Sequence, residues 1–208
     1  IDPLTGSWSQ SVLSLLPPKD RVSQIEKLTS FIRHEYGVLP TTAFFYGQVW
    51  QPLFISLLKN AGIDNVVIST YSSGDAPLYR DAFWMNELGR KEKIYPLDDC
   101  VARLVEAYSK GEIKYQELKE RVLKSLSEGD YDRTVFLNMD QLVLGRDREG
   151  EGEKPGNLVI DILSSFPTTL ISDIPVHTPG YLPQGWYGRD GLKYSFSTFN
   201  ELLVYNDS

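Results

Sequence analysis

The sequence has a single cysteine, Cys100, and only two histidines, His34 and His177. One thiol cannot form a disulfide within the chain, and three Cys and His residues are too few for the usual zinc sites, which use four such ligands. A metal site would have to be built from carboxylates alone. We therefore predict that the chain binds no metal and needs no cofactor.

Positive charge is scarcer than negative charge, with 21 Lys and Arg against 28 Asp and Glu and a net charge of −7. Without a basic stripe to neutralise phosphates, nucleic acid and anionic membrane surfaces are excluded as general partners. The longest apolar runs, such as Leu53–Leu58 and Val66–Ile68, are far shorter than the ~20 residues of a membrane-spanning helix. We expect no membrane span.

The chain begins Ile1-Asp2-Pro3-Leu4, without an initiator Met and without the basic start and apolar stretch of a signal peptide. This start has the character of a cut end. The lack of a signal and of disulfides favours the cytoplasm as the compartment.

The length and the composition, 208 residues with 41% hydrophobic and 12% aromatic side chains, predict a globular protein with a sizeable core. We expect a single domain over residues 1–208. The segment 145–156 is rich in glycine and charge, which excludes packing and predicts a mobile surface loop.

Alternating patterns predict a βαβ unit in the first third of the chain. An amphipathic helix over Asp20–Tyr36, capped by Asp20, precedes two short apolar strands, Thr41–Tyr46 and Asn65–Ser69, with a helix over Pro52–Ala61 between them. Further along, the pattern predicts strands at Lys93–Pro96, Arg133–Asn138 and Thr169–Ser172, and helices at Asp98–Ser109, Lys114–Ser127, Leu158–Phe166 and Ser197–Tyr205. The expected class is α/β, with a parallel sheet or barrel.

In such folds the chemistry lies at the carboxyl ends of the strands. The segments in question are Tyr46–Gln48, Thr70–Asp75 and Asn138–Gln141. Their carboxylates are Asp75, in a Ser/Gly turn, and Asp140, directly after an apolar run. Asp140 is the better candidate for a catalytic group, and the alternative is a cap that accepts backbone N–H groups.

Other residues with potential chemistry have two interpretations each. The four tryptophans, at positions 8, 50, 84 and 186, could stack on sugar rings or simply fill the core. His34 and His177 fit exposed or locally bonded side chains better than catalysts. No serine lies in a Gly-x-Ser-x-Gly turn, and no glycine-rich phosphate loop follows a strand.

Several strings of the sequence follow a pattern in order and spacing. Ser14–Pro17 and Asp20–Thr29 are similar to "LSLIP…DRxxQIEKLT", Phe44–Pro52 to "WLTERVWEP", and Leu57–Ile63 to "LxEAGI". These patterns resemble the middle of glycoside hydrolase family 57, which contains α-amylases and 4-α-glucanotransferases. Phe136–Gly145 is similar, more weakly, to "LHDDGEKFG". The resemblance implies an incomplete seven-stranded (β/α) barrel, of which this chain is the central part, and retaining cleavage by two carboxylates.

The carry-over of the catalytic residues is incomplete. The family's nucleophilic glutamate falls on Gly47, and the adjacent arginine falls on Gln48. Two further glutamates fall on Gln51 and Gln10. The aspartate that acts as acid and base matches Asp140, although its neighbours Asn138 and Gln141 depart from the pattern.

The resemblance therefore implies a catalytically impaired relative, because glycine has no side chain with which to attack a glycosidic bond. Such a protein would have a binding role, toward an α-glucan through Tyr46, Trp50, Asn138 and Asp140, or toward a protein partner or the remaining barrel segments. The alternative is an active α-glucan hydrolase or 4-α-glucanotransferase in which another carboxylate, such as Asp75, replaces the nucleophile and Asp140 is the acid/base. An unrelated α/β domain is the third interpretation.

Overall fold

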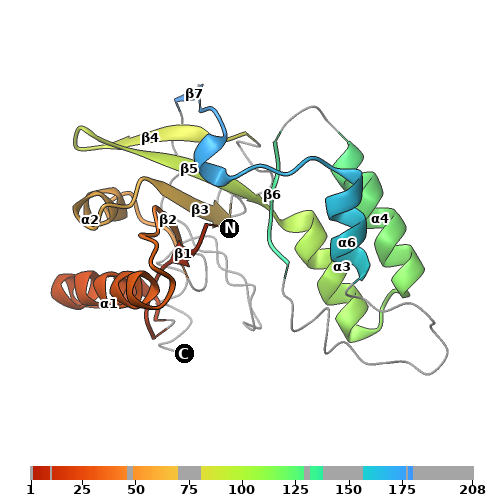
Figure 1. Cartoon of the computed structure of the whole chain (residues 1–208), viewed down its shortest axis with the longest axis horizontal. Helices are drawn as coiled ribbons and strands as arrows, with labels where there is room; N and C mark the ends of the chain where they lie inside the picture. Colours follow the sequence, from red (N-terminus) through yellow and green to blue (C-terminus); the bar gives the residue numbers. More distant parts are fainter. Residues whose placement is uncertain are drawn as a thin grey trace, which may run out of the picture. The chain divides into compact units, whose positions relative to one another are not determined.

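The computed structural model describes residues 2–9, 11–45, 49–69, 81–128, 132–137, 157–176 and 178–179 (Figure 1). The chain forms two compact units, Ile1–Pro96 with Leu170–Ser208, and Leu97–Thr169. The single domain over 1–208 stays a prediction, and the loop predicted at 145–156 lies outside the described residues.

The first unit contains most of a sheet whose described strands have the order β1-β2-β3-β5-β4-β7. Strands β1 (Leu4–Thr5), β2 (Thr42–Phe44) and β3 (Asn65–Ser69) run parallel, with Thr42 opposite both Leu4 and Asn65. Strand β7 (Thr178–Pro179) pairs in parallel with β4, and β6 (Thr134–Val135), in the second unit, pairs in parallel with the last two residues of β5. The predicted α/β class is confirmed.

The predicted βαβ unit is present as β2, helix α2 (Phe54–Asn60) and β3. Helix α1 (Pro18–Tyr36) precedes it and ends at Gly37, which has a φ of 68°. The prediction that Asp20 caps this helix is wrong, because the N-cap residue is Pro17. The helix begins at Pro18, two residues before the predicted start. Asp20 lies in its first turn, where its negative charge interacts favourably with the helix dipole.

The sequence pattern missed an antiparallel hairpin formed by β4 (Phe83–Glu87) and β5 (Arg90–Asp98). Its two-residue turn consists of Leu88, with a φ of 51°, and Gly89, with a φ of 80°. Turns of this kind usually carry Asn or Asp before the glycine, because those residues tolerate positive φ. An exposed leucine at this position gives no hairpin signal.

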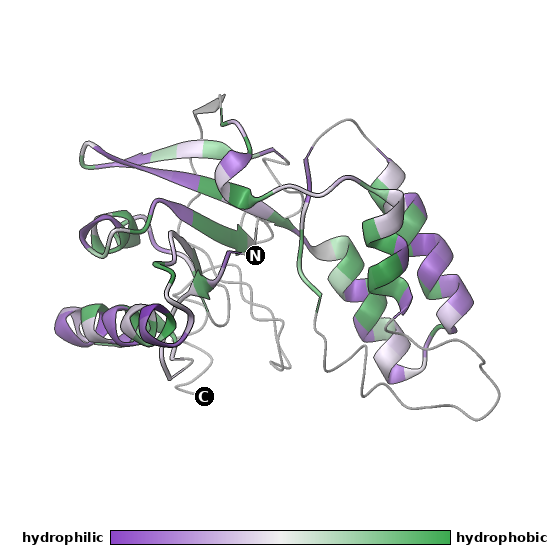
Figure 2. Ribbon diagram, viewed as in Figure 1, coloured by the Kyte–Doolittle hydropathy of each residue, from purple (hydrophilic) through white to green (hydrophobic). Residues whose placement is uncertain are grey.

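The core of the first unit contains side chains from helices α1 and α2, from the parallel strands and from the antiparallel hairpin. Figure 2 shows β3 hydrophobic along almost its whole length, whereas α1 is mostly hydrophilic. A strand that is buried on both faces is typical of a parallel sheet covered by helices. The buried cluster comprises Leu13, Ile25, Ala43, Phe45, Trp50, Phe54, Ile55, Leu58, Ile63, Val66, Ile68, Phe83, Met85 and Ile94.

The second unit is helical, with α3 (Asp99–Lys110), α4 (Tyr115–Ser127) and α6 (Asn157–Ser165), close to the predicted bounds. Val101, Val105, Leu118, Val122 and Leu158 are buried between these helices. Lys119 Nζ on α4 lies 2.9 Å from Asp161 Oδ2 on α6. None of the helices in the described ranges is long and apolar enough to cross a bilayer.

The strand predicted at Thr169–Ser172 is wrong. Ile171–Asp173 forms a 3₁₀ turn, in which the Asp173 N–H donates to the Leu170 carbonyl at 3.0 Å. A short β-branched stretch becomes a strand only where a neighbouring strand can pair with it, and here local i to i+3 bonds satisfy the backbone. The helix predicted at Ser197–Tyr205 lies outside the described residues.

Two leucines at one helix test the position of this core. Leu58 is fully buried, whereas Leu53, just before α2, is 48% exposed. We expect Leu58→Ala to lower the free energy of unfolding by about 2–5 kcal/mol, because it leaves a cavity. The matched control Leu53→Ala should cost less than about 1 kcal/mol. Urea unfolding followed by circular dichroism measures both, and equal losses would contradict this packing.

Candidate functional site

Most of the predicted site residues lie outside the described residues. These are Gln10, Tyr46, Gly47, Gln48, Asp75, Asn138, Asp140 and Gln141. Their roles stay predictions. The structure does describe what flanks them, which is the ends of β1 and β2 and the segment from Val49 into α2.

Trp50, predicted to bind substrate, is fully buried in the first unit. Its ring meets the Phe54 ring nearly at right angles, with centroids 6.2 Å apart, and Phe45 packs on Phe54 at 5.8 Å. A ring enclosed in this way holds α2 against the sheet. Substrate binding by Trp50 stays a prediction that none of the described contacts supports.

Two buried polar atoms in the same segment have no hydrogen-bond partner within the described part of the chain. They are Trp50 Nε1 and Gln51 Oε1. Buried polar groups are nearly always paired, with protein or with ordered water. The orphaned donor and acceptor directly follow Tyr46–Gln48, the segment where the resemblance places the nucleophile.

Residues in the other strings that carry the resemblance have structural roles. Ile25 and Ile63 are buried in the core, and Thr29 shares a hydrogen bond of 2.8 Å with Thr5 on β1. Arg21 ties α1 to the preceding segment, because its Nε donates to the Leu16 carbonyl at 2.7 Å and its Nη2 to the Ser14 carbonyl at 3.1 Å. Its guanidinium also lies 5.8 Å from the centre of the Phe54 ring.

The segment after β1 is fixed by Gln24 of α1. The Gln24 side-chain oxygen accepts hydrogen bonds from the Ser9 N–H and hydroxyl, both at 2.9 Å, and from the Ser7 hydroxyl at 3.2 Å. Gly6 precedes this segment, and a Cβ there would lie 2.3 Å from the Phe44 carbonyl oxygen. Only glycine allows β1 and β2 to approach so closely at their carboxyl ends.

The other aromatic and histidine candidates have local partners. Trp8 packs against Phe31 at 5.4 Å, and Lys27 lies over its ring at 4.8 Å. Trp84 donates from Nε1 to the Val176 carbonyl at 2.9 Å. His34 is exposed, beside Glu35, as predicted. Trp186 and His177 lie outside the described residues.

Asp98 is a carboxylate at the carboxyl end of a strand that the sequence pattern did not single out. Its Oδ1 accepts from the Cys100 N–H at 2.9 Å and caps α3, and its Oδ2 lies 2.8 Å from Arg133 Nη1. Arg133 also donates to the Glu128 carbonyl. With both oxygens engaged, Asp98 has a structural role in holding the start of α3 beside β6.

Glu92 on β5 is the described carboxylate with the most perturbed pKa. It is fully buried, and that burial raises its pKa from the ordinary 4.5 to about 7, against a smaller lowering by the charge of Lys59. A raised pKa suggests a general acid. However, Glu92 faces helix α2, and helices cover the outside of a barrel. It lies beside Asp64, which precedes β3, so it is at the amino end of that strand.

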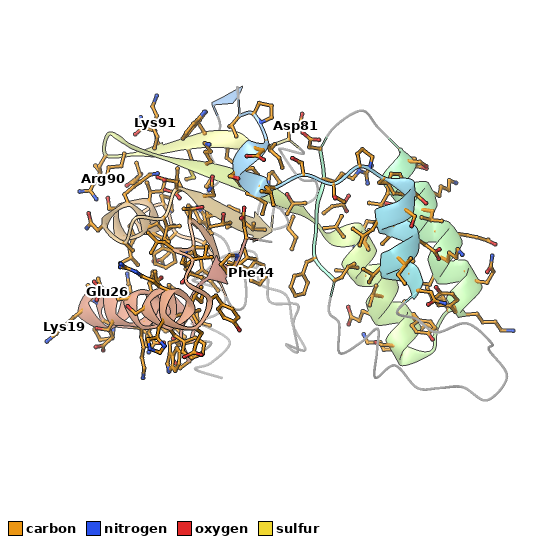
Figure 3. All side chains as sticks on the ribbon, viewed as in Figure 1. Lys19, Glu26, Phe44, Asp81, Arg90 and Lys91 are labelled. Carbon is orange, nitrogen blue, oxygen red and sulfur yellow. The ribbon has the colours of Figure 1, made fainter. Side chains whose placement is uncertain are left out.

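Several other described carboxylates lie on exposed helix faces, as Glu26 does on α1 (Figure 3). Within the described residues, no three His, Cys, Asp or Glu side chains are grouped to hold a metal ion. The described part of the chain thus forms a packed scaffold, within which Asp98 pairs with Arg133 and Glu92 lies near Lys59.

The described strands and helices define an α/β protein of the barrel type. The family model described as Glycosyl hydrolase family 57 matches residues 2–139, so the chain belongs to that family. The 4-alpha-glucanotransferase of Thermococcus kodakarensis is 28% identical over 141 residues, which is 66% of this chain and 20% of that protein. Alpha-amylase 1 of Dictyoglomus thermophilum is 28% identical over 101 residues, covering 47% of this chain and 15% of that protein. The chain spans about a fifth or less of the length of these relatives.

Solved structures agree on the fold. The 4-alpha-glucanotransferase of Thermococcus litoralis matches with a TM-score of 0.67 at 23% identity, over 89% of this chain and 30% of that one. A family 57 branching enzyme from Thermococcus kodakaraensis, crystallised with glucose, matches with a TM-score of 0.67 at 12% identity, over 90% and 50%. These likenesses confirm the predicted fold, a (β/α) barrel of the incomplete seven-stranded type or part of one.

A series at Asp98 tests whether that residue is structural. We expect Asp98→Asn to lower the free energy of unfolding by about 1–3 kcal/mol, because the amide still caps α3 but no longer offers a charged partner to Arg133. Asp98→Ala should cost about 1 kcal/mol more, since the cap is also lost. The control Glu117→Gln breaks an exposed pair with Arg121 and should cost less than about 1 kcal/mol. Chemical unfolding of the three variants measures this order, and an unchanged stability in Asp98→Ala would contradict it.

Proposed function

We propose that this chain is a catalytically impaired member of family 57 that binds α-glucans. The observation that carries the proposal is Gly47, which the resemblance places at the nucleophile. Retaining cleavage needs two carboxyl groups about 5–5.5 Å apart, one to attack the anomeric carbon and one to move the proton. Glycine supplies neither a nucleophile nor a charge.

A single remaining carboxylate cannot compensate for this loss. General acid catalysis alone contributes roughly 10²–10⁴-fold, whereas enzymes accelerate their reactions by about 10⁶-fold or more. By the resemblance, Asp140 keeps its carboxylate, but Gln10, Gly47 and Gln51 have replaced three glutamates.

The described packing supports a scaffold that is maintained without the catalytic charges. Val49 and Trp50, which flank the Gly47 segment and match the family pattern, are both buried. The relatives are named 4-alpha-glucanotransferase and alpha-amylase, so an α-linked glucan is the first ligand to test. Tyr46, Asn138 and Asp140 are the residues proposed to contact it.

Binding can be measured by titrating maltoheptaose into the protein in a calorimeter. We expect a dissociation constant of about 1 mM or lower, equivalent to roughly −4 kcal/mol. A cello-oligosaccharide of equal length, with β linkages, should give no heat. Tyr46→Ala should weaken binding about tenfold or more by removing an aromatic contact, and the control Tyr36→Ala, on the exposed end of α1, should not. The absence of binding at millimolar maltoheptaose would leave a protein-docking role.

Catalysis can be tested by the release of reducing ends from amylose. We expect the unmodified protein and its Asp140→Asn variant to be equally inert, because no second carboxylate assists Asp140. Gly47→Glu should gain measurable release, and Gly47→Gln, which adds the same bulk without a carboxylate, should not.

The alternative is an enzyme that uses a substitute nucleophile, with Asp140 as the acid/base. It predicts release by the unmodified protein that Asp140→Asn abolishes, and release that Asp75→Asn also abolishes would identify Asp75 as the nucleophile. Either result would overturn the proposed impairment.

A further inference from the structure

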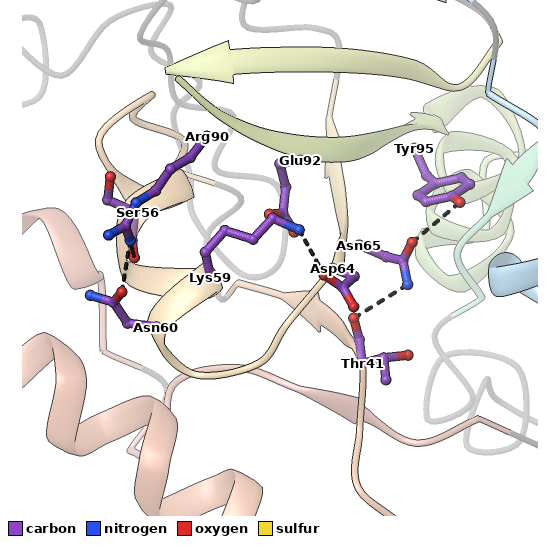
Figure 4. Close-up of polar contacts among 9 residues, drawn as sticks. All are labelled: Thr41, Ser56, Lys59, Asn60, Asp64, Asn65, Arg90, Glu92 and Tyr95. Carbon is purple, nitrogen blue, oxygen red and sulfur yellow. Dashed lines mark hydrogen bonds and ion pairs between the residues drawn. The ribbon is translucent and has the colours of Figure 1, made fainter. Parts of the chain in front are cut away.

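Three charged side chains meet where helix α2, the residue before β3 and the β4–β5 hairpin come together (Figure 4). Lys59 Nζ lies 2.7 Å from Asp64 Oδ1 and 3.3 Å from Glu92 Oε2. The Glu92 side chain has no exposed surface, whereas that of Asp64 is 65% exposed. We call these three residues, Lys59, Glu92 and Asp64, the α2–hairpin cluster.

Glu92 has apolar surroundings on the face that it shares with α2. It lies opposite Met85 in the hairpin register, and Met85, Ile94 and Leu58 are all fully buried. Within the described part of the chain, neither of its oxygens accepts a hydrogen bond with good geometry. An ionised carboxylate in such a place lacks most of the solvation that water would provide.

The polar groups on the neighbouring elements are already engaged. Arg90, on the same strand, donates to the Ser56 carbonyl at 3.0 Å and to Asn60 Oδ1 at 2.7 Å, both on α2. The Tyr95 hydroxyl donates to Asn65 Oδ1 at 3.4 Å, and Asn65 Nδ2 donates to the Thr41 carbonyl. Among the described groups that face Glu92, the charged ones are therefore Lys59 and Asp64.

The charges of the α2–hairpin cluster do not balance when all three groups are ionised. One ammonium then faces two carboxylates, and it lies closer to Asp64, which can also be solvated by water. Neutral Glu92 removes the excess negative charge and the cost of burying an anion. The cluster is balanced when Glu92 carries a proton.

We propose that Glu92 is a pH-dependent latch, which holds the β4–β5 hairpin against helix α2 while it is protonated and loosens the hairpin when it ionises. The geometry that supports the latch is a fully buried carboxyl on the hairpin that shares a single ammonium with a second carboxylate. This device is independent of any glucan binding.

The pKa shifts set the direction and the range of the effect. Burial, and secondarily Asp64, raise the pKa of Glu92 to about 7 against the lowering by Lys59. A group whose folded pKa lies above its unfolded value stabilises the fold fully below the unfolded pKa, here 4.5, and loses that contribution as the pH rises through 7. For Lys59, burial acts to lower the pKa, but the hydrogen bond to Asp64 and the charges of Glu92 and Asp64 outweigh it, so the pKa is raised. Lys59 is therefore charged throughout this range.

Hydrogen exchange of the whole chain, read by mass spectrometry between pH 5 and pH 8, tests the latch. After correction for the intrinsic exchange rate, the opening constant of peptides covering 83–98 should rise about tenfold or more over this range. Peptides from α4 provide an internal reference that should not change. Glu92→Gln should make the hairpin equally protected at both pH values, and the control Glu87→Gln, on the other strand of the hairpin, should keep the pH dependence of the unmodified protein.

A second variant keeps the test decisive if Glu92→Gln does not fold. Lys59→Met removes the one ammonium that favours ionised Glu92 and so raises the folded pKa of Glu92 further. The pH at which the rise in hairpin opening levels off should therefore move upward. Hairpin protection that is independent of pH in the unmodified protein would overturn the proposal. So would a pH dependence that persists in Glu92→Gln, or one that does not move in Lys59→Met.

Discussion

The edge-on packing of Trp50 against Phe54 is the contact on which the first unit depends. Trp50 ends the segment that leads from β2, Phe54 begins helix α2, and both rings are fully buried with Phe45 beside them. The Arg21 guanidinium over Phe54 joins helix α1 to the same cluster. Because interiors are close-packed, a change in either ring would disturb the βαβ unit and the helix that covers it.

The close packing of this core explains which parts of the family pattern are present in the chain. Val49, Trp50, Ile25 and Ile63 lie in the strings that match the pattern, and all four are buried in the core. A catalytic glutamate stabilises a transition state, and a fold can dispense with it without loss of packing. The sequence around Gly47 thus keeps the residues that pack in the core and lacks the charged residues of the family pattern. This difference is the physical basis of the proposed binding role.

Local patterns predicted the part of the fold in which local and tertiary preferences agree. The strand at Asn65–Ser69 was predicted with the observed bounds, because an apolar β-branched run soon after a helix and Gly62 has few alternatives. The hairpin was missed because Leu88 occupies a positive-φ turn position that usually carries Asn or Asp. The first residues of β5 are charged, so the pattern predicted only the later part of this strand, without Glu92. The burial of that carboxylate depends on Lys59 and Met85, which come from other elements, so periodicity cannot reveal it. The candidate site residues were predicted from the resemblance and from the positions of strand ends. Asp98 was not among them, because its strand was predicted to end at Pro96, two residues too early.

The central claim is that the family scaffold here lacks a second catalytic carboxylate. The most direct measurement is the distance from the Asp140 carboxyl to the nearest other carboxyl in a crystal of the protein grown with maltoheptaose. We expect an α-glucan beside Gly47 and no other carboxyl within about 6 Å of Asp140. A carboxyl of Asp75 or of another residue about 5–5.5 Å from Asp140, facing the anomeric carbon of the sugar, would contradict it.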